Sequence, residues 1–134
     1  MRKFIFILVL AGFSLAAWAD ELPARQGLIA FRAPMEAIVK EAAKGQKSDL
    51  DEMARMYKGA GDAWQQVAGQ ALDLGQYGVP VDRQEDVWRQ VRTMSMLVGY
   101  MDEAIKRGNR GLMLRSAELL TPAYEKLAAS LGVR

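Results

Sequence analysis

The chain has 134 residues, with 18 Lys and Arg against 16 Asp and Glu, and it contains neither cysteine nor histidine. Without thiols and imidazoles it can form no disulfide, no Cys/His zinc site, no covalent c-type haem attachment and no Ser-His-Asp or Cys-His catalytic group. A nucleophile–base pair could be assembled only from carboxylates, so we do not expect an enzyme.

The N-terminal residues have the form of a secretory signal peptide. Residues 1–3 are Met-Arg-Lys, residues 4–17 carry no charge, and residues 17–19 are the cleavage pattern Ala-Trp-Ala. The uncharged run is short for a membrane span, although an uncleaved anchor is the alternative. We therefore expect a signal peptide at 1–19 and one domain at 20–134, exported to the periplasm. Because the signal holds two of the 18 basic residues and no acidic residue, the exported chain is formally neutral, and its charge does not indicate nucleic-acid binding.

Four segments of the exported chain have apolar residues in steps of three and four, which is the spacing of amphipathic helices. These positions are Leu28, Phe31, Met35, Ile38 and Ala42; then Leu50, Met53, Tyr57, Ala60, Trp64, Val67, Ala71 and Leu74; then Val87, Val91, Met94, Val98, Met101 and Ile105; and finally Met113, Ala117, Leu120, Tyr124, Leu127 and Leu131. No segment alternates with a period of two, so we predict no strand. The expected fold is all-α, an antiparallel up-down-up-down four-helix bundle.

The limits of the first two helices follow from small and polar residues. Residues 20–27 are expected to fray before the first helix. Gly45 is predicted to end that helix and Ser48 to cap the second. Gly59 and Gly61 weaken the second helix, and we expect them to admit a neighbouring backbone or a ligand.

The second half of the chain contains one sizeable loop and one tight turn. The loop is predicted at 75–82, and Asp82 with Glu85 resembles a capping box that starts the third helix. Gly108 is predicted to end the third helix, and Asn109 to cap the fourth.

Some of these segments resemble a known family. The run at 97–104, the turn at 108–109 and the helix that ends at 123–127 resemble the last two helices of cytochrome b562. Arg25 and Gln26 are similar to the first helix of the related cytochromes c′. The resemblance implies an exported four-helix bundle of the kind that holds haem between its helices.

The resemblance also indicates where haem ligands would lie. In that family the axial histidine is near the chain end, where it closes a CxxCH motif in the c′ branch. Here Thr121 and Tyr124 stand at the two cysteine positions and Glu125 at the histidine. The axial methionine of the b562 branch falls near Leu28 and Ile29. We therefore expect a haem-free protein with vacated ligand positions, and the alternative is b-type haem held by a phenolate or a thioether.

The methionines suggest one metal. Met53 and Met56 have the MxxM spacing that places two thioethers on adjacent turns, and Met94, Met96 and Met101 could join them across the bundle. Thioethers suit Cu(I). Most of these residues lie on the apolar positions, where methionine fills gaps in a core, so we assign no metal site and keep the MxxM pair as the candidates.

Aromatic residues offer two kinds of contact. Tyr57, Trp64 and Tyr124 fall on the apolar positions, where they would form core or line an apolar ligand pocket. Trp88, beside its apolar stripe, and Tyr77, in the loop, are candidate contact residues for a partner.

These observations favour a binding or interaction protein. Its partner would be another protein or a small apolar ligand, and a homodimer is left open. The alternatives are an electron carrier with b-type haem on non-histidine ligands and a Met-based Cu(I)-binding protein.

Overall fold

The computed structural model describes residues 22–69 and 71–133. Its helices are α2 (Pro23–Ala42), α3 (Leu50–Ala68), α4 (Val81–Arg107) and α5 (Arg110–Ser130), with short 3-10 turns η1 (Gly45–Lys47) and η2 (Leu74–Tyr77). The described part of the chain contains no strand, so the predicted all-α four-helix bundle is confirmed. None of its helices has the length and apolar character that crossing a bilayer requires. The predicted signal peptide at 1–19 lies outside the described residues.

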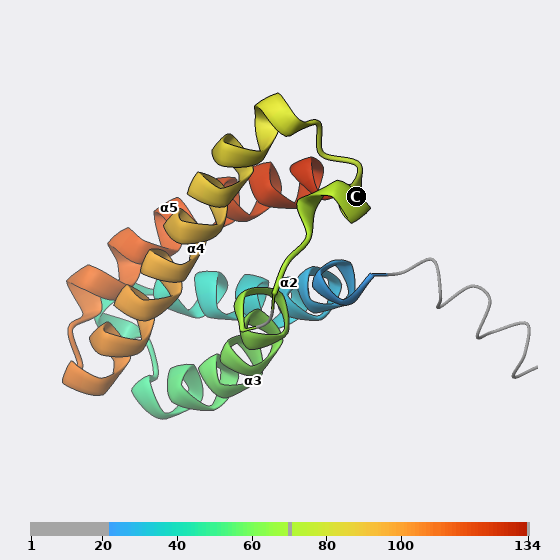
Figure 1. Cartoon of the computed structure of the whole chain (residues 1–134). Helices are drawn as coiled ribbons and strands as arrows, with labels where there is room; N and C mark the ends of the chain where they lie inside the picture. Colours follow the sequence, from blue (N-terminus) through green and yellow to red (C-terminus); the bar gives the residue numbers. More distant parts are fainter. Residues whose placement is uncertain (1–21, 70, 134) are drawn as a thin grey trace, which may run out of the picture.

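The helices pack as two consecutive pairs, α2 with α3 and α4 with α5, and the pairs pack against each other (Figure 1). Polar contacts give the relation between α2 and α5. Arg25, near the start of α2, donates from Nε to the carbonyl oxygen of Leu131, just beyond α5, at 2.6 Å. Arg110, at the start of α5, donates to the carbonyl oxygen of Ser48, beyond the end of α2, at 3.1 and 3.2 Å. The start of α2 therefore lies beside the end of α5, and the end of α2 lies near the start of α5, so the two helices run in opposite directions.

The core consists mainly of the predicted apolar positions. All six predicted positions of α5 are buried, as are all five of α2. Four predicted positions of the other segments are not: Leu50, Tyr57 and Ile105 are half-buried and Ala71 is exposed. The heptad spacing therefore identified the buried side of each helix, because a helix places residues three and four apart on one face.

The first helix begins earlier than predicted, because the loop between α3 and α4 caps it. Pro23 is the first helical residue, where its missing N–H costs nothing. The next backbone N–H, of Ala24, donates to the Tyr77 hydroxyl at 2.9 Å. The Arg25 guanidinium lies 5.4 Å from the centre of the Tyr77 ring. Tyr77 is buried by these contacts, so its prediction as an exposed partner contact is wrong.

The second helix is capped by Asp49 and not, as predicted, by Ser48. Asp49 Oδ1 accepts hydrogen bonds from the backbone N–H groups of Asp51 and Glu52 at 3.0 and 3.2 Å. Ser48 instead donates from Oγ to the carbonyl oxygen of Gly45 at 2.7 Å. Gly45 has the expected left-handed backbone, with φ 63°, but it lies in η1, beyond the end of α2. The negative charge of Asp49 is favourable at the helix N-terminus, and the hydroxyl of Ser48 is used in the preceding turn.

Both limits of the loop between α3 and α4 differ from the prediction. The α3 helix ends at Ala68, before the predicted Leu74, which η2 nevertheless folds into the core. The α4 helix begins at Val81 without a side-chain cap, so Asp82 and Glu85 form no capping box. This loop is held by packing against the core, and local sequence patterns do not predict such tertiary contacts.

The turn between α4 and α5 is as predicted. Gly108 has φ 64° and ends α4, because this left-handed conformation strains any residue with a β-carbon. Asn109 Oδ1 accepts a hydrogen bond from the backbone N–H of Leu112 at 3.0 Å and so caps α5. The short turn makes α5 run back along α4 (Figure 1).

The helices α2 and α3 approach each other closely at Gly27. A β-carbon at Gly27 would lie 2.7 Å from Cγ2 of Val67 and 3.1 Å from the carbonyl oxygen of Ala63. By contrast, a β-carbon at Gly59 would meet no atom within 4 Å, and the atoms nearest to one at Gly61 belong to the side chain of Tyr57 in its own helix. The expectation that Gly59 and Gly61 admit a neighbouring backbone is therefore wrong, and a ligand beside them stays a prediction.

Candidate functional site

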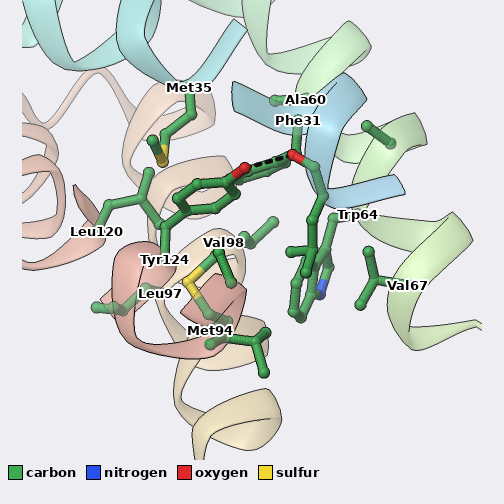
Figure 2. Packing of buried hydrophobic residues seen from close by; sticks show 14 of the residues in the cluster. Phe31, Met35, Ala60, Trp64, Val67, Met94, Leu97, Val98, Leu120 and Tyr124 are labelled. Atoms are coloured by element: carbon green, nitrogen blue, oxygen red, sulfur yellow. Dashed lines mark hydrogen bonds between the residues drawn. The ribbon is translucent and has the colours of Figure 1, made fainter. Parts of the chain in front are cut away.

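Tyr124, at one of the two cysteine positions of the resemblance, is fully buried in the interior of the bundle. Its hydroxyl donates to the carbonyl oxygen of Leu28 at 2.5 Å, and the dashed line in Figure 2 marks this bond. Its ring stacks on Phe31 with the ring centres 5.8 Å apart and the planes at 22°. The two regions that would supply axial ligands, near Leu28 and near Tyr124, are thus joined directly by a hydrogen bond.

The neighbours of Tyr124 fill the space between the helices. Phe31 also contacts Trp64, with ring centres 6.0 Å apart. Figure 2 shows Met35, Met94 and Leu120 around the same tyrosine ring. The indole N–H of Trp64 donates to Ser95 Oγ at 3.1 Å. Trp64 and Tyr124 therefore pack in the core, the simpler of the two roles considered for them. Tyr57 is half-buried, and its hydroxyl donates to the carbonyl oxygen of Val98 at 3.2 Å.

The phenol of Tyr124 is a poor candidate for a haem ligand. Burial raises its pKa, although the Arg32 guanidinium, 5.1 Å from the ring centre, acts in the opposite direction. A phenolate ligand would also have to abandon the hydrogen bond to Leu28. The residues at the vacated position do not fit a haem group.

The other two vacated positions are more exposed than Tyr124. Glu125 is exposed, and its Oε1 lies 3.3 Å from Nη1 of Arg32 in an ion pair. Thr121 is half-buried. The histidine position of the resemblance therefore lies on the outer surface of α5, where a ligand side chain would not point into the bundle.

The candidate metal ligands are divided between the core and the surface. Met53, Met94 and Met101 are buried, Met56 lies at the edge of the core, and Met96 is 54% exposed. Met96 therefore does not join the others across the bundle. The described residues also contain no group of three or more acidic side chains that could hold a metal ion.

A groove on the outer surface of α4 and α5 is the site that the sequence reasoning missed. It has a volume of about 520 Å³, is half-open to solvent, and has an almost entirely apolar wall. The α4 side includes Thr93, Met96, Leu97 and Tyr100, and the α5 side includes Leu112, Arg115, Ser116, Leu119, Pro122, Ala123 and Lys126. Its volume is typical of ligand-binding pockets, which span roughly 300–1,000 Å³.

The groove arises because α4 and α5 each carry a second apolar stripe. Met96 and Tyr100 are one turn apart on α4, and Leu112 and Leu119 are two turns apart on α5, so each pair lies on one face. These stripes are displaced from the core positions toward solvent. The spacing was visible in the sequence, but only the packing of α4 against α5 makes the two stripes neighbours.

Cationic side chains border this groove. Arg115 and Lys126 line it, and Arg92 lies one turn before Met96 on α4. None of these three cations forms an ion pair with the described residues, although most other arginines of α4 do. Asp86 lies beside Lys126 in an adjoining hollow, but it already pairs with Arg89 and accepts a hydrogen bond from Gln90.

Trp88 is the remaining predicted contact residue. It is 37% exposed on α4, and it is not part of the groove. Its role as a partner contact stays a prediction.

Comparisons with known proteins found no family model, no curated protein and no solved structure that matches this chain. The four-helix fold is compatible with the bundle of cytochromes b562 and c′, but the relationship itself is supported only by the residues quoted above.

Proposed function

We propose that this protein is an exported, haem-free four-helix bundle that acts as a binding or interaction protein through the groove between α4 and α5. The main support for the proposal is the contrast between the bundle interior at Tyr124 and the surface groove between α4 and α5. At the interior position, Tyr124 is packed and hydrogen-bonded across the bundle. On the outer surface, Met96 and Leu119 are 54% and 53% exposed in an apolar groove.

Large apolar side chains that gather in a surface groove are typical of binding sites. Scattered exposed apolar residues need no such explanation, and Ile29 on α2 is one of them. The lack of imidazole and thiol groups leaves little means for catalysis, so binding is the function that these side chains support best.

The groove is tested with a neutral apolar dye, Nile red, followed by fluorescence. We expect Leu119→Lys to weaken dye binding about fivefold or more, the equivalent of roughly 1 kcal/mol. The matched control is Ile29→Lys, because Ile29 is as exposed as Leu119 but lies on α2, away from the groove. Equal dye binding by the two variants would reject the groove as the site.

Haem binding is the competing function and has its own test. Haemin is added to the purified protein, and the Soret band and the thermal midpoint are recorded. We expect neither a shifted band nor a stabilised protein. A tight one-to-one complex that is lost in Tyr124→Phe would replace the proposal with a b-type haem protein.

Two further parts of the proposal have direct measurements. The mass of the protein recovered from the periplasm of its host should correspond to a chain that begins at Asp20. Competition with a Cu(I) chelator should show no binding tighter than micromolar; tighter binding that Met53→Leu and Met56→Leu abolish would support the copper alternative.

A further inference from the structure

We infer that the occupant of the groove between α4 and α5 is an amphipathic helix of another protein, with an apolar stripe flanked by acidic residues. This inference rests on the proposed function of the groove and specifies its partner. It depends on three features of the groove, which are its length, its apolar register and the positions of its cations.

The groove has the length and spacing that a helix requires. Its α5 side extends from Leu112 to Lys126, which corresponds to about 21 Å at 1.5 Å per residue. A helix of about 14 residues, four turns, has the same length. The apolar side chains of the wall recur at helical spacing, so a partner helix can place its anchors at i, i+3, i+4 and i+7 between them.

The charges at the groove define the edges of that partner helix. Arg115 and Lys126 lie eleven residues apart on α5, about 16 Å, and Arg92 lies on α4. Because no described carboxylate pairs with these cations, each is available to an acidic side chain of the occupant. Acidic residues along one edge of the apolar stripe would meet Arg115 and Lys126 on α5. Acidic residues along the other edge would face α4, where Arg92 lies one turn before the lining residue Met96. Such complementarity speeds association and excludes wrong partners.

The same charges disfavour three other occupants. Two copies of this chain that met groove to groove would bring Arg92, Arg115 and Lys126 of each close to those of the other. A fatty acid has one carboxylate, which would leave cations at the far end unmatched. The N-terminal segment of the chain itself has Arg2 and Lys3 and no acidic residue before Asp20.

The test uses the purified protein and labelled helical peptides of about 15 residues, followed by fluorescence anisotropy. All peptides have the same leucine stripe, and the flanking positions are glutamate in one, lysine in a second and glutamine in a third. We expect the glutamate peptide to bind about tenfold tighter than the lysine peptide, with a preference that weakens as salt is raised.

Matched variants of the protein locate the binding. Leu119→Ala should weaken the glutamate peptide about tenfold, whereas Ile29→Ala should not change its affinity. The double variant Arg115→Glu with Lys126→Glu should reverse the preference between the glutamate and lysine peptides. Lys58→Glu, at an exposed lysine of α3 with no ion pair among the described residues, is the charge control.

The outcomes distinguish failure of the proposed helical partner from failure of the groove as a binding site. Dye binding that Leu119→Lys abolishes, together with no preference for the glutamate peptide, would overturn the helix while leaving the proposed function intact. Hexadecanoate that displaces the dye when the glutamate peptide does not would identify an acyl chain instead. A dimer in sedimentation experiments that Leu119→Lys dissociates would identify a second copy. If neither dye nor peptide depends on Leu119, both the partner and the proposed function fail.

Discussion

The contact of α2 with α3 at Gly27 leads to a prediction whose sign differs from the usual rule. Replacing glycine by alanine inside a helix normally stabilises it by about 1 kcal/mol, because alanine loses less backbone entropy on folding. We expect this gain for Gly59→Ala, since a β-carbon there would meet no atom within 4 Å. Gly27→Ala should instead destabilise the protein.

The magnitude follows from the atoms that surround Gly27. A β-carbon would lie 2.7 Å from Cγ2 of Val67, 3.1 Å from the carbonyl oxygen of Ala63 and 3.2 Å from Cβ of Gln66. Val67 is fully buried, and its β-branched side chain has few alternative rotamers. Overpacking of this kind costs about 1–3 kcal/mol, which exceeds the gain of about 1 kcal/mol from the helix. The net expectation is a loss of about 1 kcal/mol.

Urea unfolding of both variants and the parent protein measures this difference. Gly27→Ala and Gly59→Ala should differ by about 2 kcal/mol, which corresponds to about 1 M in the urea midpoint for a slope near 2 kcal/mol/M. The parent should lie between them. If Gly27→Ala were as stable as Gly59→Ala, the close approach of the two helices would be wrong.

Three further predictions concern single side chains. Tyr124→Phe removes the buried hydrogen bond to Leu28 and should cost about 1 kcal/mol in urea unfolding; an unchanged midpoint would show that this bond adds nothing. Burial and, to a lesser extent, the charge of Asp102 raise the pKa of Tyr57 to about 12. The protonated phenol therefore stabilises the fold fully below about pH 10, and this stabilisation is lost as the pH rises from about 10 to about 12. Tyr57→Phe should remove a late step from the ultraviolet titration of the tyrosines, and a titration without that loss would contradict the burial. Asn109→Ala should cost about 1 kcal/mol by removing the cap of α5, whereas glycine at the same position should cost only a few tenths.

Glu125→His, which places a histidine where the resemblance expects one, should not confer haem binding when haemin is added and the Soret band is recorded. Glu125 is exposed and pairs with Arg32 on the surface, so the imidazole of Glu125→His would lie outside the bundle. The interior would still be filled by Tyr124 and Phe31.

The sequence alone determined the helices and their buried sides. Steps of three and four residues identified the core positions of α4 and α5 because the α-helix imposes a fixed geometry on every chain. The turn at Gly108 and Asn109 was equally clear, because a left-handed glycine and an amide cap act within a few residues of each other. Local chemistry suffices where both partners of an interaction are close in the sequence.

The tertiary structure decided which segments meet. Tyr77 caps α2 across more than fifty residues, and Gly27, not Gly59, allows two helices to approach. The groove likewise exists only because α4 and α5 pack with their second apolar stripes side by side, at Met96 and Leu119. Such contacts depend on the relative placement of whole helices, which is set by packing across the entire core and has no signal in any short stretch of sequence.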